Sequence, residues 1–215
     1  MSPQPSARDR RRSWLFLLLE VLLIVLGVLL GMAANEWRVA RGHRQQADQA
    51  LRQIAGELRF NREQVDGVIE HHQALKDSLA LLVGRQDVQG ENIGHADLWK
   101  ALSGGFRYPL IESTAWNLAL QTGAVEHMDY GPATGLSRYY NFQSFYSAKL
   151  SVISNNVYTA VNMDADSADG LIRALHLLMG DIVINEERLI EQIDVIIPRL
   201  DELVPPEEAE PDPAP

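Results

Sequence analysis

The densest group of side chains that could bind a metal ion is His71 and His72, beside Asp66 and Glu70. Asp66 and Glu70 are four residues apart, so they share one face of a helix. A zinc site on a helix pairs two histidines at helical spacing, and neither His71 nor His72 has such a partner. We therefore interpret this group as solvated helix surface, and we expect no metal ion and no cofactor.

A second acidic group, Asp164, Asp166 and Asp169, alternates along the chain like the ligands of a calcium loop. The glycine at the sixth position and the glutamate at the twelfth position of such a loop are absent, so capping of a following helix explains these residues better. The sequence has no Gly-rich phosphate loop, no G-x-S-x-G and no H-E-x-x-H. It also has no cysteine, which excludes disulfides and a thiolate nucleophile. These absences predict that the protein is not an enzyme.

Aromatic side chains are concentrated in the middle third of the chain, and aromatic rings dominate small-molecule pockets. The candidates for lining such a ligand pocket are Trp99, Trp116, Tyr139, Tyr140 and Tyr146. The helical spacing of Tyr139 and Tyr146 argues instead for packing in a core, with the phenol groups hydrogen-bonded at its rim. The spacing favours the core, and the pocket stays an alternative.

The chain begins with a long apolar run, WLFLLLEVLLIVLGVLLGMAA, from Trp14 to Ala34. A helix of this length would cross the hydrocarbon layer of a bilayer, which is about 30 Å thick. The apolar region of a cleavable signal peptide has only about 7–15 residues and would not contain Glu20. We therefore predict a transmembrane helix over 14–35 that acts as an uncleaved signal-anchor of a single-pass membrane protein.

Orientation follows from the positive charges that flank this run, because Lys and Arg stay preferentially in the cytoplasm. Four arginines stand within residues 1–13, whereas the arginines after the run are dispersed among acidic residues. This modest bias predicts a cytoplasmic basic stub over 1–13 and an extracytoplasmic domain over 36–203. We expect the last segment, 204–215, to be a disordered tail because it is acidic and proline-rich.

One face of the predicted membrane helix combines small residues with an acid. The acid and the small residues recur at steps of three and four, so they lie on one face of the helix, and we predict a helix–helix contact there. In that contact a partner would shield the carboxyl of Glu20 from lipid. The alternative is that the glycines are ordinary for a membrane helix and that Glu20 snorkels to the headgroups. The predicted contact face consists of Glu20, Ile24, Gly27, Gly31 and Ala34.

After the membrane segment, apolar residues keep recurring at steps of three and four as far as Val83, which predicts one long helix. Asn61 and His72 fall on this apolar seam, where they either set the register of a coiled coil or face water. Residues 84–95 read as a loop, and Ser113 as the cap of a short helix. No alternating strand pattern occurs. The predicted fold is all-α: the membrane helix, then an antiparallel helical bundle of about three long and two short helices.

The charge of the chain limits its partners. The formal net charge is -10, although the first twelve residues hold four Arg against one Asp, so the remainder is more acidic still. Such a domain repels phosphate, and we expect no nucleic acid as a partner. The expected partners are the lipid bilayer and either a second copy of this chain or another membrane protein.

Two stretches support a resemblance to a family. The segment LLEVLLIVLGVLLGMAANEWR, and the segment STAWNLALQTGAVEHM followed by the pair Tyr139-Tyr140, resemble two signatures of a family of uncharacterised bacterial single-pass membrane proteins. The resemblance implies a bacterial membrane-anchored helical protein of unknown activity. Together with the orientation predicted above, the expected location is the bacterial inner membrane, with the helical domain in the periplasm. It implies no chemistry.

Together these patterns predict a non-enzymatic interaction or scaffold protein of the bacterial cell envelope, which forms oligomers. The alternative is an extracytoplasmic small-molecule sensor domain that signals through a membrane partner. The small-residue face of the membrane helix favours the first, and the aromatic residues of the middle third favour the second.

Overall fold

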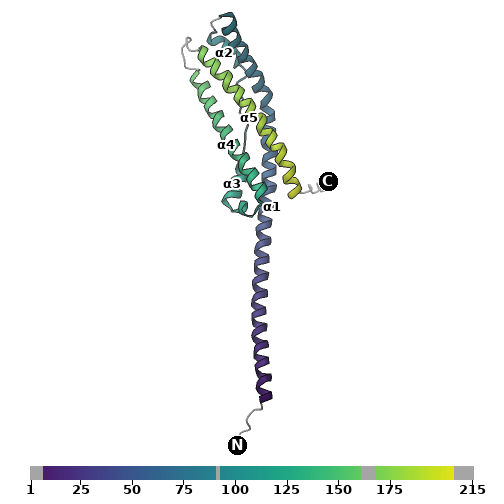
Figure 1. Ribbon diagram of the computed structural model, residues 1–215. Coiled ribbons are helices and arrows are strands. Elements are labelled where there is room, and N and C mark those ends of the chain that lie inside the picture. The colour runs from purple at the N-terminus through teal and green to yellow at the C-terminus, as the bar shows by residue number, and fades with distance from the viewer. Residues whose placement is uncertain (1–6, 91–92, 161–167, 206–215) are drawn as a thin grey trace, which may run out of the picture. The chain divides into compact units, whose positions relative to one another are not determined.

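The computed structural model describes the backbone of residues 7–90, 93–160 and 168–205, and the side chains of residues 18–90, 93–94, 96–155 and 170–205. Within these residues the protein is all-helical and has no strand, which confirms the predicted fold class. It divides into two compact units, Met1–Gln46 and Ala47–Pro215. The elements, shown in Figure 1, are α1 (Ala7–Gln89), α2 (His95–Ala101), α3 (Thr114–Gln121), the short 3-10 helix η1 (Ala124–His127), α4 (Tyr130–Ala160) and α5 (Ala168–Leu203).

The first unit contains the beginning of α1. The side chains of residues 18–45 are all exposed, including every Leu, Ile and Val from Leu18 to Leu30. Leucine favours helix, and the apolar residues surround the helix on all sides rather than forming one stripe. By length and composition this part of α1 could cross a membrane.

The second unit has a core of its own. From Ala47 onward α1 buries one face, with side chains recurring at steps of three and four and neighbouring pairs buried before Asn61. The apolar stripes of α4 and α5 pack into the same cluster. Fully buried members include Ile54 and Leu79 of α1, Leu136 of α4 and Ile193 of α5. One-sided burial is what an amphipathic helix requires, because each stripe needs an apolar partner.

Side-chain contacts define how the helices of this unit run. Arg59 contacts Asp201, and His72, further along α1, contacts Glu186, so α5 runs opposite to α1. The part of α1 after Gln46, α4 and α5 lie side by side in Figure 1.

The end of α1 differs from the sequence prediction, which began a loop at residue 84. The helix continues to Gln89, and Gly90 ends it with a φ of 66°, a left-handed conformation that favours glycine. Gly84 therefore lies inside the helix, where glycine costs about 1 kcal/mol relative to alanine. Beyond this glycine, the exposed Asp87 of α1 pairs with Arg173 of α5.

The start of α3 also differs from the prediction. Ser113 is the residue before the helix, but its side chain makes no capping hydrogen bond. Instead, the backbone N–H of Ala115 donates to the Glu57 carboxylate of α1 at 2.7 Å. A distant acid therefore caps this helix, and its negative charge also suits the positive end of the helix dipole.

Candidate functional site

The most unusual polar structure in the domain surrounds residues 105–113, the non-helical segment that precedes α3. This segment has no strand partner, so side chains of α1 bind its backbone. The carbonyl of Gly105 lies 2.8 Å from His71 Nε2, and the carbonyl of Arg107 lies 2.8 Å from His72 Nε2. Outside helices and strands, backbone carbonyls need other partners, and here the two histidines of α1 provide them.

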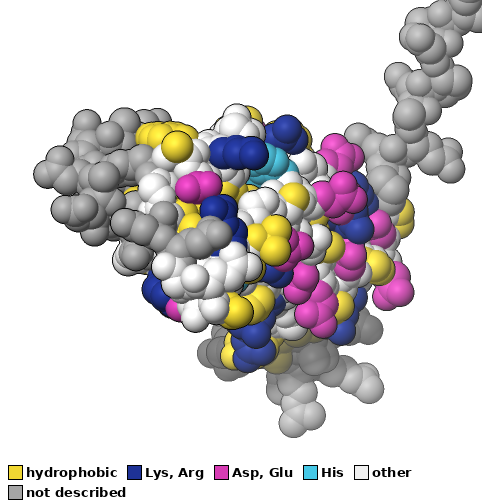
Figure 2. All heavy atoms as spheres, turned by 90° about the horizontal axis from the view of Figure 1, so that it is seen from above, with side chains coloured by type: hydrophobic (Ala, Val, Ile, Leu, Met, Phe, Trp, Pro, Cys, Tyr) yellow, Lys and Arg dark blue, Asp and Glu magenta, His cyan; other side chains and the backbone are white. Residues whose placement is uncertain are grey.

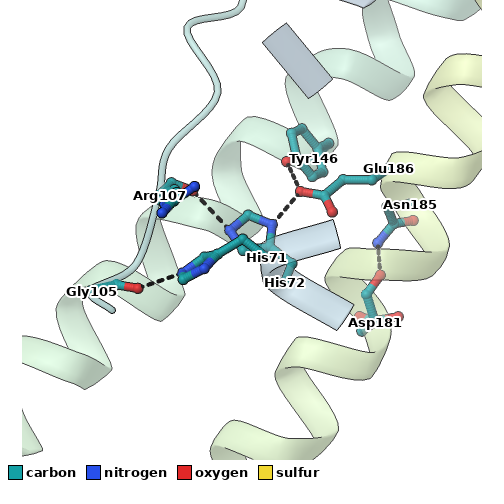
Figure 3. Close-up of polar contacts among 8 residues, drawn as sticks. All are labelled: His71, His72, Gly105, Arg107, Tyr146, Asp181, Asn185 and Glu186. Atoms are coloured by element: carbon teal, nitrogen blue, oxygen red, sulfur yellow. Dashed lines mark hydrogen bonds and ion pairs between the residues drawn. The ribbon is translucent and has the colours of Figure 1, made fainter. Parts of the chain in front are cut away.

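Figure 3 shows the centre of this arrangement, where side chains of three helices meet. His72 Nδ1 of α1 lies 2.7 Å from Glu186 Oε1 of α5, and the Tyr146 hydroxyl of α4 donates to the same oxygen at 2.6 Å. All three residues are fully buried. The ring of Phe106 stacks on His72 with its centroid 4.7 Å away and covers the imidazole.

The partners of His72 define where the protons are. The Arg107 carbonyl can only accept, so His72 Nε2 carries a hydrogen and donates it. Two acceptors would repel one another at 2.7 Å, so a proton also lies between His72 Nδ1 and Glu186 Oε1. Whichever atom holds this proton, the His72–Glu186 pair has no net charge, and this is how a domain interior tolerates both groups.

Burial also determines the properties of the two acids in this cluster, the Tyr146 phenol and the Glu186 carboxyl group. Burial raises the pKa of Tyr146 far above its usual range, and the neighbouring Glu186 acts in the same direction. The second oxygen of Glu186 is buried and has no hydrogen-bond partner among the described residues. The cluster therefore joins α1, α4 and α5 through side chains that are not exposed at the protein surface.

A second buried cluster lies nearer the first unit along α1. Besides capping α3, Glu57 accepts a hydrogen bond from the Tyr140 hydroxyl at 2.6 Å. Burial, followed by the hydrogen bond to Glu57, raises the pKa of this phenol far above its usual range. Trp116 of α3 stacks on Tyr140 at 5.1 Å with nearly parallel rings. One carboxylate thus connects α1, α3 and α4 through charge-assisted hydrogen bonds.

Asn61 and Gln143 complete this second cluster. The Asn61 side chain accepts from the Glu112 N–H and donates to the Glu112 carbonyl, both at 2.8 Å, and Gln143 of α4 donates to the same carbonyl. The Asn61 amide thus pairs with both the N–H and the carbonyl of Glu112, as the backbone of a neighbouring β-strand would. Asn61 therefore fixes the position of the segment that precedes α3.

The five aromatic residues predicted for a ligand pocket lie in different places. Tyr139 and Tyr140 contact one another edge to face, Tyr140 stacks on Trp116, and Tyr146 belongs to the Glu186 cluster. Trp99, on α2, is 43% exposed. Four of the five are thus buried in the core, and the structure does not bring all five together.

The metal-ligand candidates are also separated. Asp66 and Glu70 are exposed, as predicted, but the prediction of solvated surface is wrong for His72, which is buried against Glu186. No group of three potential ligands that could hold a metal ion occurs in the part of the chain that the structure describes. Asp164 and Asp166, together with the side chain of Asp169, lie outside the described residues.

The predicted contact face of the membrane helix lies on the first part of α1. Glu20, Ile24 and Ala34 are exposed, and a Cβ added at Gly27 or Gly31 would meet nothing within 4 Å. The face therefore has room for close approach of another helix.

Sequence reasoning missed the most important polar residues of the domain. Only Asn61 and His72 were noticeable in the sequence pattern, since each interrupts a row of apolar residues on the predicted helix. Glu57, Gln143 and Glu186 are ordinary polar residues of amphipathic helices in the sequence, and only their partners distinguish them. A search for polar residues on the buried face of each predicted helix is the signal that would have found them.

Comparison with known proteins adds no relative: no family model, no curated protein and no solved structure matches this chain.

Proposed function

We propose that this protein is a single-pass protein of the bacterial inner membrane that acts as a non-enzymatic scaffold and self-associates. Its N-terminus would lie in the cytoplasm and residues 36–203 would form a periplasmic, antiparallel helical bundle. The observation that carries the proposal is the complete exposure of the apolar side chains from Leu18 to Leu30, next to a unit that has its own core. In water this surface would be costly, whereas lipid would cover it.

Residues just after the apolar run support an anchor that ends there. Trp37 is exposed, and the Arg41 guanidinium lies 5.6 Å from the centre of its ring. Tryptophan is enriched at the membrane–water interface, and arginine reaches the headgroups from there. The pair would hold the end of the span at this interface.

The surface of the second unit supports an aqueous location for it. Figure 2 shows one face on which apolar side chains are scattered among charged ones and Asp and Glu gather along one side. A lipid-facing surface would instead be continuously apolar. The acidic character also agrees with the absence of nucleic acid among the expected partners.

The scaffold role is supported by the way the domain uses its polar groups. His72, Glu186, Glu57 and Asn61 all bind other parts of the same domain, and they hold the long helices and the 105–113 segment together. Such networks stiffen a fold and define a single packing. A stiff domain tethered to a membrane is suited to presenting a constant surface to partners.

Self-association would use the face of Gly27 and Gly31. Without a hydrophobic force between helices in lipid, small residues stabilise pairing because they allow close packing. Glu20 lies on the same face, and a second copy would shield this carboxyl from lipid.

The experiment uses the fact that the protein has no cysteine. Ile24→Cys places a single thiol on the proposed contact face, and the matched control Leu29→Cys places one on the opposite face of the same helix. Oxidation in native membranes should give disulfide dimers of Ile24→Cys and few of Leu29→Cys. Adding Gly27→Ile or Gly31→Ile to Ile24→Cys should abolish the dimer.

Equal crosslinking from both faces, or none from either together with no co-purifying partner, would contradict the scaffold proposal. Orientation is tested separately with Glu70→Cys, which lies on exposed α1 surface. A maleimide that cannot cross membranes should label this thiol in spheroplasts. Labelling only after lysis would reverse the proposed topology.

A further inference from the structure

A small cavity opens where the first turns of α4 face the last turns of α5. Its volume is about 200 Å³. The α4 wall consists of Gly131, Pro132, Gly135 and Leu136, and the α5 wall of Ile196 and Leu200, with Arg199 beside them. A dry cavity of about 150 Å³ lined by apolar side chains takes a ligand as large as benzene, so this one can hold a short hydrocarbon chain.

The glycine on the cavity wall has no steric reason to be glycine. Gly135 lies inside α4 without a positive φ, and a Cβ built on it would meet nothing within 4 Å. Alanine would therefore fit and would favour the helix by about 1 kcal/mol. What the missing side chain preserves is the open volume between the two helices. The same holds for Gly131, one turn earlier.

The polar group of the cavity is a cation. Arg199 is exposed at the wall, and it has no ion pair or hydrogen bond with any described residue. Its neighbours on the wall are apolar and uncharged, so the guanidinium is the group that would recognise the polar end of a ligand. Guanidinium groups bind carboxylates with two parallel hydrogen bonds.

We propose that this cavity binds a single-chain anionic amphiphile, a short fatty acid, with the hydrocarbon chain between α4 and α5 and the carboxylate on Arg199. This site goes beyond the scaffold role and does not depend on it, since all of its residues belong to the second unit. It is also separate from the aromatic residues that the sequence indicated as a ligand pocket.

The test uses the full chain in lipid nanodiscs and an octanoic acid that carries a diazirine at its far end. After illumination, mass spectrometry should find the label on the peptides of the first turns of α4 and the last turns of α5. Label on residues 18–32 reports probe dissolved in lipid and serves as the internal reference. Excess unlabelled octanoate should suppress the first signal and leave the second.

Variants define the site. Gly135→Leu fills the cavity and should reduce cavity labelling about tenfold, because the leucine side chain occupies the volume that the ligand needs. Gly135→Ala is the graded control: it adds one methyl group to the wall and should reduce cavity labelling less than Gly135→Leu does. If circular dichroism shows that Gly135→Leu does not fold, Ile196→Trp takes its place, because the tryptophan fills the cavity from the α5 wall.

The charge requirement is tested with Arg199→Gln. It should weaken cavity labelling by the acid about twofold to fivefold, the range of a partly exposed ion pair, and should not change labelling by the matching alcohol. Cavity labelling that persists in Gly135→Leu, or that excess octanoate does not suppress in the wild type, overturns the site. Labelling by the acid that is insensitive to Arg199→Gln overturns the assignment of an anionic ligand.

Discussion

Two stretches of α1, residues 18–45 and residues 47–89, are both helical and differ in what covers them. In the first stretch every side chain is exposed, whereas the second buries one face. The difference follows from the arrangement of apolar residues, which surround the helix over residues 18–34 of the first stretch and form one stripe in the second. A helix that is apolar on all sides is typical of a membrane span or of the core of a large protein, whereas a single apolar stripe requires only neighbouring helices.

Polar residues show the same contrast. Glu20 of the first stretch is exposed on an apolar helix and has no ion pair or hydrogen bond with the residues that the structure describes. Glu57, Asn61 and His72 of the second stretch are buried, and each has bonded partners in distant parts of the domain. Polar residues of the second stretch thus have partners within the domain, whereas for Glu20 a partner in another chain is part of the proposed self-association.

The largest expected effect comes from breaking the buried pair of the second stretch. His72→Ala leaves Glu186 buried without its partner, and we expect the free energy of unfolding to fall by about 3–5 kcal/mol. The measurement is denaturant unfolding of the full chain in micelles, followed by circular dichroism. Glu70→Ala removes an exposed charge two residues earlier and should change stability by less than about 0.5 kcal/mol.

The double variant His72→Leu/Glu186→Leu refines this prediction. It should recover part of the stability, because apolar side chains can replace a buried ion pair at little cost, whereas the Tyr146 hydroxyl and the Arg107 carbonyl each lose a partner. A double variant that is no more stable than His72→Ala would mean that the pair contributes through its geometry rather than through charge compensation.

A matched pair of leucines compares the two stretches directly. Leu79 is fully buried and Leu26 is half exposed on the same helix. Leu79→Ala should reduce the free energy of unfolding of the domain by about 2–5 kcal/mol, and Leu26→Ala should leave it unchanged. Similar losses from both would show that the unfolding of the two stretches is coupled.

The smallest expected effect is the response of the domain to alkaline pH. Burial raises the pKa of Tyr146 above the value of about 10 that it has in the unfolded chain. Above that pH the unfolded chain loses the phenol proton and the folded chain keeps it, so stability falls as pH rises, by about 1.4 kcal/mol per unit for each such group. Urea unfolding between pH 9 and 11 measures the slope.

Tyr146→Phe is the control for this pH response. It should be less stable at neutral pH, since Glu186 loses a donor, but its stability should fall less steeply with alkaline pH than that of the wild type. An unchanged slope would mean that Tyr146 stays protonated in the unfolded chain or ionises without unfolding.

The helices were largely predictable because their stripes are local. The spacing of Leu58, Leu75 and Leu79 predicts a helix without knowledge of its neighbours. The ends were less predictable: a glycine and several polar residues after Val83 favoured a loop, whereas α1 continues through Gly84 to Gln89, and its Asp87 pairs with Arg173 of α5. The prediction that Ser113 caps α3 was wrong because the acid that caps this helix lies more than fifty residues earlier in the chain.

By itself the sequence determined the all-helical class and a first helix that is apolar on every side, because helix periodicity and hydropathy depend only on neighbouring residues. The tertiary structure alone decided the roles of Glu57, Gln143 and Glu186 and moved His72 from surface to core. Hydrogen bonds between distant helices leave no periodic trace in the sequence. The same is true of the cavity at Gly135, which exists only because α5 lies opposite.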